Sequence, residues 1–179
     1  MKRILVVLTA VALFGLPLTG FGMDLSEIKY GIHGGVMLPQ GDLDDDANAD
    51  MGYVVGGQMV LPTGIMDELM AGLSLDYVMT DGDYDMELSG IELMGLGRYV
   101  FDLGNDVKLF GQLGLGVLMW DFEIGSGWNK YEDDGTDFGF AIGGGLSFME
   151  NFEAVALYKS FDTGDTDAEY ITLTVGYNF

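Results

Sequence analysis

Hydrophobic and polar residues alternate along most of the chain after residue 27. Between Ile28 and Leu38 the even positions hold apolar residues or glycine, whereas the odd positions include Lys29 and His33. A period of two is typical of a β-strand, because successive side chains point to opposite faces. The same pattern recurs along the chain, and we predict eight strands, over residues 28–38, 51–61, 69–79, 91–101, 107–119, 138–148, 152–160 and 171–179.

The segments between these strands alternate in length. The long polar connections are 39–50, 80–87, 121–137 and 162–169, and the short ones are 62–68, 102–106 and 150–151. Long loops at one end, tight turns at the other and an even number of strands are typical of an outer-membrane barrel. A soluble sandwich or lipocalin-like barrel also has short alternating strands and is the alternative.

The two faces of the predicted strands favour the membrane barrel. One face carries Leu, Ile, Val, Phe and Tyr with almost no charge, and the other carries glycines interleaved with charged residues. Eight strands leave an interior that side chains can just fill, so the polar face lies inside and the apolar face meets lipid. We predict an all-β fold: an eight-stranded antiparallel transmembrane up-and-down β-barrel, closed by pairing of the last strand with the first.

The N-terminal segment has the pattern of a secretory signal peptide. Lys2 and Arg3 precede an apolar run over residues 4–16, and Gly20 and Gly22 provide small residues before a plausible cleavage site. The run is shorter than the ~20 residues that a helix needs to cross a bilayer. We predict a signal peptide over residues 1–22 and an outer-membrane β-barrel domain over 23–179.

Composition narrows the classes of partner and of chemistry. The chain has 29 acidic residues against 7 Lys and Arg, a net charge of −22, and no cysteine. We expect no binding to nucleic acid, because proteins hold phosphate backbones chiefly with Lys and Arg. Disulfides are excluded as a source of stability.

The C-terminus and the fourth predicted strand carry a resemblance to a known family. The alternate residues Leu173, Val175, Tyr177 and Phe179 resemble the C-terminal signal of bacterial outer-membrane proteins, which the barrel assembly machinery recognises. Residues 91–101 resemble the fourth-strand motif of the OmpA/OmpX-like small outer-membrane β-barrel superfamily, although Met94 stands where proline is common. Residues 34–42 resemble that family's passage from first strand to first loop. The resemblance implies the cell outer membrane, periplasmic termini and long loops outside the cell.

Charged residues on the polar face are the candidate site. Ionised groups inside so narrow a barrel must be paired or hydrated. We expect a structural ion-pair network that plugs the lumen, and the alternative is a gate that opens a water-filled path when pairs exchange. The residues concerned are Lys29, His33, Asp76, Glu92, Arg98, Lys108, Glu153 and Lys159.

The long connections are strongly acidic. They hold 19 of the 29 acidic residues and a single basic residue, Lys130. Ca²⁺ or Mg²⁺ would bridge such carboxylates to lipopolysaccharide phosphates, whereas the favoured interpretation is that the loops are simply solvated. Asp81, Asp83 and Asp85 match the start of an EF-hand loop, but Met86 occupies the position that requires glycine, so the match is rejected.

Catalysis finds little support in the sequence. A Ser–His–acid hydrolase, as in lipid A-modifying barrels, would have to use His33, the only histidine, which falls in mid-strand on the lumen face. We therefore expect a hydrogen-bonded lumen histidine and no catalytic, cofactor or metal site. Trp120 lies at the start of the third long connection and Trp128 within it, and they are either a contact patch for a partner or ordinary packing.

Together these patterns predict a function without catalysis. We expect a monomeric outer-membrane barrel with a structural or surface-interaction role, as an adhesin or in envelope integrity. Its expected partners are outer-membrane lipid, lipopolysaccharide and the barrel assembly machinery. A small ion or solute channel and a lipid A-modifying enzyme are the alternatives.

Overall fold

The computed structural model describes residues 28–41, 43, 49–82, 86–124, 131–162 and 167–179. The predicted signal peptide over residues 1–22 lies outside the described residues. The strands are β1 (Lys29–Gln40), β2 (Gly52–Pro62), β3 (Leu69–Gly82), β4 (Met86–Gly104), β5 (Val107–Ile124), β6 (Tyr131–Phe148), β7 (Phe152–Asp162) and β8 (Asp167–Asn178). Within the described part of the chain, no helix has the length and apolar character to cross a membrane.

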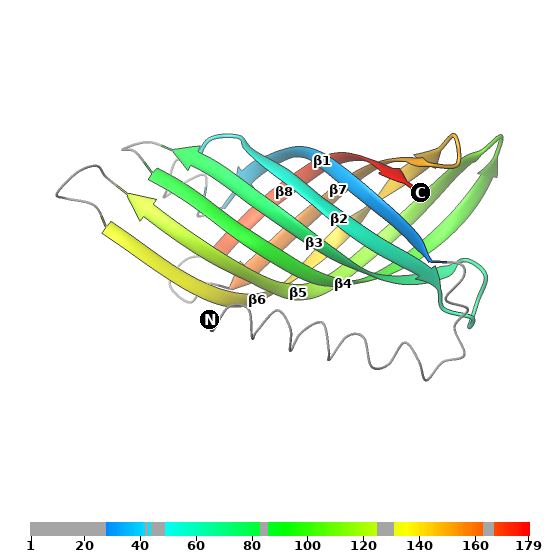
Figure 1. The fold of residues 1–179 in the computed structure, drawn as a ribbon, viewed down its shortest axis with the longest axis horizontal. Coiled ribbons are helices and arrows are strands. Elements are labelled where there is room, and N and C mark those ends of the chain that lie inside the picture. Colours follow the sequence, from blue (N-terminus) through cyan, green and yellow to red (C-terminus); the bar gives the residue numbers. More distant parts are fainter. Residues whose placement is uncertain (1–27, 42, 44–48, 83–85, 125–130, 163–166) are drawn as a thin grey trace.

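The eight strands close into one barrel. Each strand pairs antiparallel with its neighbour in the chain, and β8 returns to pair with β1 from Gly31↔Asn178 to Gln40↔Glu169 (Figure 1). Where the barrel is closed, every strand satisfies its backbone hydrogen bonds inside the sheet, which a structure surrounded by lipid requires. The predicted fold and its closure are confirmed.

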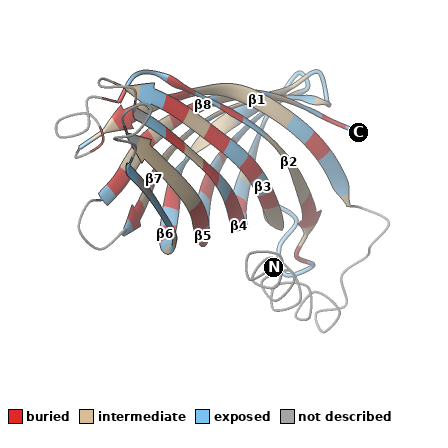
Figure 2. Ribbon diagram, turned by 60° about the vertical axis from the view of Figure 1, so that its left-hand side comes forward, coloured by how far each residue is buried: buried red, intermediate tan, exposed pale blue. Residues whose placement is uncertain are grey.

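The outer and inner faces of the barrel differ as the period of two predicts. Ile32, Leu113 and Val175 on the outer face are each about three-fifths exposed, while the residues beside them in the chain are more covered (Figure 2). The four residues of the proposed assembly signal, Leu173, Val175, Tyr177 and Phe179, are likewise all exposed. Their recognition during assembly stays a prediction.

Three strands are much longer than the sequence pattern predicts. β4, β5 and β6 have 19, 18 and 18 residues, whereas a tilted strand crosses a bilayer with about 9–11. The predicted limits at residues 91, 119 and 138 are therefore wrong. Acidic residues interrupt the hydrophobic alternation there, but the backbone ladder continues through Glu87↔Glu123 and Glu123↔Glu132. In Figure 1, β5 and β6 extend beyond β7 and β8 at the left.

The two ends of the barrel differ in their connections. We call the end with residues 41–51, 83–85, 125–130 and 163–166 the loop end, and the end with the short turns and Phe179 the turn end. Asn105 and Asp106 both have positive φ, 54° and 59°, as a two-residue hairpin turn of type I′ requires. Met149 and Glu150 adopt the same left-handed region at φ 52° and 64°, where such side chains are disfavoured.

The last residues of the chain bind the turn end together. The Asn151 carbonyl accepts from the Asn178 N–H at 2.7 Å, and its side-chain amide donates to the Asn178 carbonyl at 2.6 Å. Phe179 N–H donates to the Tyr30 carbonyl at 2.8 Å. The β6–β7 turn, β8 and β1 are thus joined where the barrel closes.

Replacing Met149 by asparagine should stabilise the protein. Asparagine tolerates the left-handed conformation that Met149 adopts, so we expect Met149→Asn to raise the free energy of unfolding by up to about 1 kcal/mol. Urea unfolding in detergent micelles measures the change. Ile65→Asn is the matched control, since Ile65 is exposed in another turn and has no positive φ; an equal gain there would contradict the backbone explanation.

Candidate functional site: the interior of the barrel

Arg98 on β4 is the centre of one buried polar cluster, which we call the turn-side cluster. Its Nη1 donates to Glu153 Oε1 at 2.8 Å, and its Nε and Nη2 donate to Gln112 Oε1 at 3.0 and 2.8 Å. The guanidinium also lies over the Phe110 ring, 3.9 Å from the centroid. Arg98 is 3% exposed, so the Glu153 carboxylate, the hydrogen bonds and the face of the Phe110 ring together replace the water that the guanidinium loses on burial.

Gln58 on β2 completes the turn-side cluster. Its oxygen accepts from Arg98 Nη2 at 3.3 Å, and its Nε2 donates to Glu153 Oε2 at 2.9 Å and to Asn178 Oδ1 at 3.3 Å. Five strands, β2, β4, β5, β7 and β8, therefore contribute to one hydrogen-bonded layer across the lumen. Both oxygens of the Glu153 carboxylate are used, as a buried charge requires.

Lys159 on β7 is the centre of the second cluster, which we call the loop-side cluster. Its ammonium contacts Asp76 Oδ2 at 3.2 Å and also pairs with Glu92 Oε2. Asp76 Oδ1 is 2.8 Å from His33 Nε2, and Glu92 Oε1 accepts from the Tyr170 hydroxyl. Lys159, Asp76, Glu92 and Tyr170 are at most 4% exposed.

Glycine at position 56 gives the Asp76 carboxylate its place. A Cβ at residue 56 would lie 2.1 Å from Asp76 Oδ1 and 2.6 Å from the Leu75 carbonyl oxygen. Any side chain would therefore displace the carboxylate or separate β2 from β3. Glycine on the polar face thus leaves room for a neighbouring charged side chain.

A small polar cavity lies beside both clusters. It has a volume of about 30 Å³, and one water needs roughly 10–15 Å³ on the same measure. Carboxylates, amides and hydroxyls line it together with the apolar side chains of Leu96 and Val155, and its size and polar groups suit a few water molecules. The lining includes His33, Gln58, Ser74, Asp76, Gln112 and Glu153.

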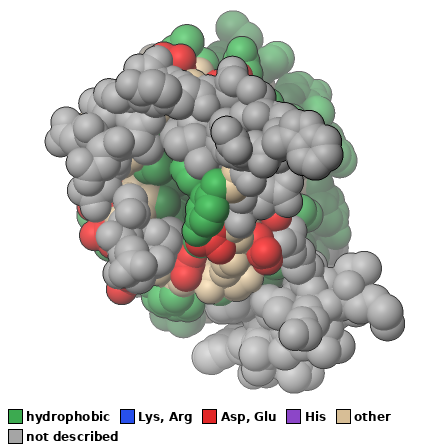
Figure 3. Space-filling view, turned by 90° about the vertical axis from the view of Figure 1, so that its left-hand side faces the viewer, with side chains coloured by type: hydrophobic (Ala, Val, Ile, Leu, Met, Phe, Trp, Pro, Cys, Tyr) green, Lys and Arg blue, Asp and Glu red, His purple; other side chains and the backbone are tan. Residues whose placement is uncertain are grey.

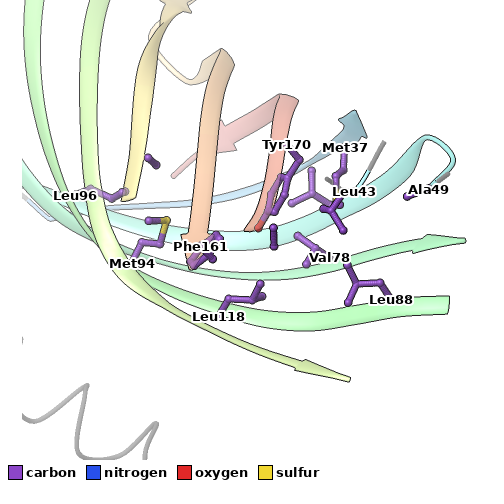
Figure 4. Close-up of a cluster of buried hydrophobic side chains, with 13 residues drawn as sticks. Met37, Leu43, Ala49, Val78, Leu88, Met94, Leu96, Leu118, Phe161 and Tyr170 are labelled. Carbon is purple, nitrogen blue, oxygen red and sulfur yellow. The ribbon is translucent and has the colours of Figure 1, made fainter. Parts of the chain in front are cut away.

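Apolar side chains gather in the loop-end half of the interior, where the sequence pattern predicts only a polar filling. Their cluster includes Val54, Val78, Leu118, Phe161 and Tyr170, all at most 3% exposed (Figure 4). Alternation identifies the inner face but not the height of a residue along the barrel. The same cluster includes Met94 and Leu96, which lie on β4 between Glu92 and Arg98, so apolar side chains fill the loop end and also lie between the two polar clusters.

Trp120 packs against this apolar cluster and does not form a surface patch. Its indole N–H donates to Asp137, and a Cβ at Gly135 would lie 2.7 Å from the indole ring. Of the two interpretations of the tryptophans, packing therefore holds for Trp120. Trp128 lies outside the described residues.

The structure brings together six of the eight predicted lumen residues. They are His33, Asp76, Glu92, Arg98, Glu153 and Lys159. Lys29 and Lys108 are instead exposed near the turn-end limits of β1 and β5, and no ion pair joins either of them to a described residue. The prediction that these two lysines join the network is wrong, because they have the right parity but lie too close to the strand ends.

Sequence reasoning also missed partners that carry no charge. Phe110 and Gln112 contact Arg98 and share the parity of Lys108 on β5. Tyr170 contacts Glu92 from β8, where it has the parity opposite to the outward Leu173 and Val175. The predicted lumen residues are all ionisable, so the neutral residues on the same inner face are not among them. The parity rule applied to every residue type would have found them.

Acidic side chains also lie around the opening at the loop end (Figure 3). The described residues contain no group of three or more His, Asp or Glu placed to hold a metal ion. Several loop acids, among them Asp83, Asp85 and Asp165, lie outside the described residues. The bridging of loop carboxylates to lipopolysaccharide through Ca²⁺ or Mg²⁺ stays a prediction.

Removing one partner of the turn-side ion pair should destabilise the barrel strongly. Arg98→Met leaves Glu153 buried without its cation, and we expect a loss of about 3–5 kcal/mol in the free energy of unfolding. Adding Glu153→Gln should recover part of that loss. Urea unfolding of the two single variants and the double variant in vesicles measures the coupling.

Lys108→Met is the matched control, because it removes an exposed cation from the same barrel. We expect a change within about 0.5 kcal/mol. A loss at Lys108 as large as that at Arg98 would contradict a role for buried pairing.

Comparisons with known proteins agree with the architecture. The family described as "Outer membrane protein beta-barrel domain" matches residues 67–179. The chain is similar to the N-terminal β-barrel domain of Pseudomonas aeruginosa OprF, with 18% identity over 85% of this chain and 96% of that one and a TM-score of 0.50. It is also similar to Neisserial surface protein A, with 15% identity, the same coverage of both chains and a TM-score of 0.55.

The attachment invasion locus protein of Yersinia pestis, Ail, is 19% identical over 85% of this chain and 96% of that one, with a TM-score of 0.47. No curated protein matches the chain. The family match spans more than half of the sequence, and the closed eight-stranded barrel agrees with it. The chain belongs to the outer-membrane β-barrel domain family and is a protein of the outer membrane.

Proposed function

We propose that this protein is a plugged outer-membrane barrel with a structural or surface-interaction role. The observation that carries the proposal is the interior, where the described residues of the turn-side cluster, the loop-side cluster and the apolar cluster fill the lumen around a cavity of about 30 Å³. Eight strands enclose an interior that side chains can fill. A filled barrel can act through its outer surface and its ends, but it offers no passage for ions or solutes.

The loop end supports the surface-interaction half of the proposal. In the orientation that the family resemblance implies, this end would lie outside the cell, and β4, β5 and β6 extend there beyond the length needed to cross lipid. Charged groups gathered at this end, such as Asp133 and Asp134, are exposed. Bound Ca²⁺ or Mg²⁺ between these carboxylates and lipopolysaccharide phosphates is part of the proposal.

Planar-bilayer recording tests whether the lumen is closed. The folded mature chain should give no steady single-channel current, and millimolar Ca²⁺ should not change that result. Reproducible openings would contradict the plugged barrel and favour the alternative, a small ion channel in which the Arg98 and Lys159 pairs exchange. A heat-dependent shift in gel mobility verifies that the inserted protein is folded.

Lipid A modification is the remaining alternative, and Ser74 tests it. Ser74, His33 and Asp76 all line the cavity, which are the residue types of a hydrolase triad. The cavity is too small for an acyl chain, and Ser74 is 7% exposed. We expect the mass spectrum of lipid A to be the same in cells with the protein, with Ser74→Ala and without the protein. A change that needs the intact protein and disappears in Ser74→Ala would establish an enzyme.

A further inference from the structure

Side chains on the inner face of the barrel are matched in size where β8 pairs with β1. We call this pairing, which closes the barrel, the seam (Figure 1). Each of three successive inner pairs holds one glycine and one larger residue, and the glycine changes strand from each pair to the next. These pairs are Gly31↔Asn178, His33↔Gly176 and Gly35↔Thr174.

The three glycines of the seam have no room for a side chain. A Cβ at residue 31 would overlap the Asn178 side-chain oxygen. A Cβ at residue 35 would lie 2.7 Å from the Cα of Thr174, and one at residue 176 would lie 3.0 Å from the Cβ of His33. Eight strands leave an interior that side chains just fill, so each larger residue uses the space beside a glycine.

The outer face of the same seam shows no such crowding. Gly34 lies opposite Val175 there, and Val175 is 60% exposed. A Cβ at residue 34 would have its nearest neighbour, the Val54 carbonyl oxygen, at 3.6 Å, which is an ordinary contact. The requirement for glycine opposite a larger residue thus belongs to the inner face.

The size match distinguishes registers that hydrophobic alternation does not. A slip of one residue would turn every side chain to the wrong face, but a slip of two keeps inner residues inside. In one direction such a slip would place His33 opposite Asn178 and would leave Gly35 opposite Gly176. In the other direction His33 would face Thr174, and two glycines would again meet. Either slip crowds one inner pair and leaves a gap at another, and both are destabilising.

We propose that the inner face of the seam is a register lock, in which glycines and larger side chains fit together in one register only and so decide how the barrel closes. Asn178 connects the lock to the interior, because its Oδ1 accepts from Gln58 Nε2 at 3.3 Å. Gln58 in turn contacts Glu153 and Arg98. A slipped seam would move Asn178 away from Gln58 and leave the turn-side cluster incomplete. The lock does not depend on a closed lumen, so a conducting barrel would leave it standing.

Cross-linking of paired cysteines measures the register directly, because the chain has no cysteine of its own. Val36→Cys with Leu173→Cys joins two residues that are paired in the structure. Val36→Cys with Ile171→Cys, or with Val175→Cys, joins residues that would be paired only after a slip of two. Diagonal neighbours lie roughly 7–8 Å apart, which exceeds the span of an unstrained disulfide. After mild oxidation of the folded chain in phospholipid vesicles, we expect the first pair to cross-link at least about tenfold more than the other two.

Exchanging the two residues of one inner pair tests the lock by substitution. Gly31→Asn alone places asparagine opposite Asn178, and we expect much less folded protein in the heat-dependent gel shift. Adding Asn178→Gly restores one glycine and one asparagine to the pair, and the new side chain lies beside Gln58 on β2. We expect this exchange to recover both the folded fraction and the cross-link between residues 36 and 173.

Asn178→Gly alone leaves two glycines opposite each other and should loosen the lock without crowding it. We expect a cross-link at one of the two slipped pairs to increase at least about threefold. Gly34→Val is the matched control, because it adds a larger side chain to the outer face of the same seam. Folding and register should not change in this control.

The lock is refuted if the slipped pairs of the parent chain cross-link as strongly as the native pair. An exchanged protein that folds no better than Gly31→Asn would mean that glycine at position 31 does more than leave space. Equal damage from Gly34→Val would show that the size match is not specific to the inner face. The result for the parent chain needs no change on the inner face, so it decides the question even where an inner variant does not fold.

Discussion

The backbone of a chain in lipid must satisfy all its hydrogen bonds internally, and the rest of this structure depends on that constraint. Pairing of β8 with β1 meets it by removing the sheet edges across the membrane. Closure with eight strands makes the interior narrow, so inward side chains meet one another instead of water. The outer face must then be apolar, and any charge must lie inside and be paired.

The interior follows from this narrowness. Three carboxylates, Asp76, Glu92 and Glu153, share two buried cations and the imidazole of His33, and each carboxylate contacts more than one donor. Gly56 leaves the room that the Asp76 carboxylate fills. Toward the loop end the filling becomes apolar. Polar groups and hydrocarbon thus complete a single plug, which explains why the proposed role belongs to the surface.

Outside the membrane the constraint is lifted, because water can satisfy a free edge. β5 and β6 continue there without β7, and acidic residues replace the apolar belt on the same ladder. Plugging and projection are therefore two results of one architecture: lipid demands a closed sheet, and solvent permits an open one.

The sequence by itself determined the number of strands, the two faces and the parity of the buried charges, because alternation reports the direction of each side chain. Only the tertiary structure decided which charges meet. Arg98 pairs with Glu153 across 55 positions, and Lys159 joins Asp76 and Glu92, whereas Lys29 and Lys108 remain outside. Parity gives the face of a residue but not its height, and height depends on strand register and tilt. The sequence pattern did not predict the long loop-end parts of β4, β5 and β6 for a related reason: backbone pairing continues where hydrophobic alternation has stopped.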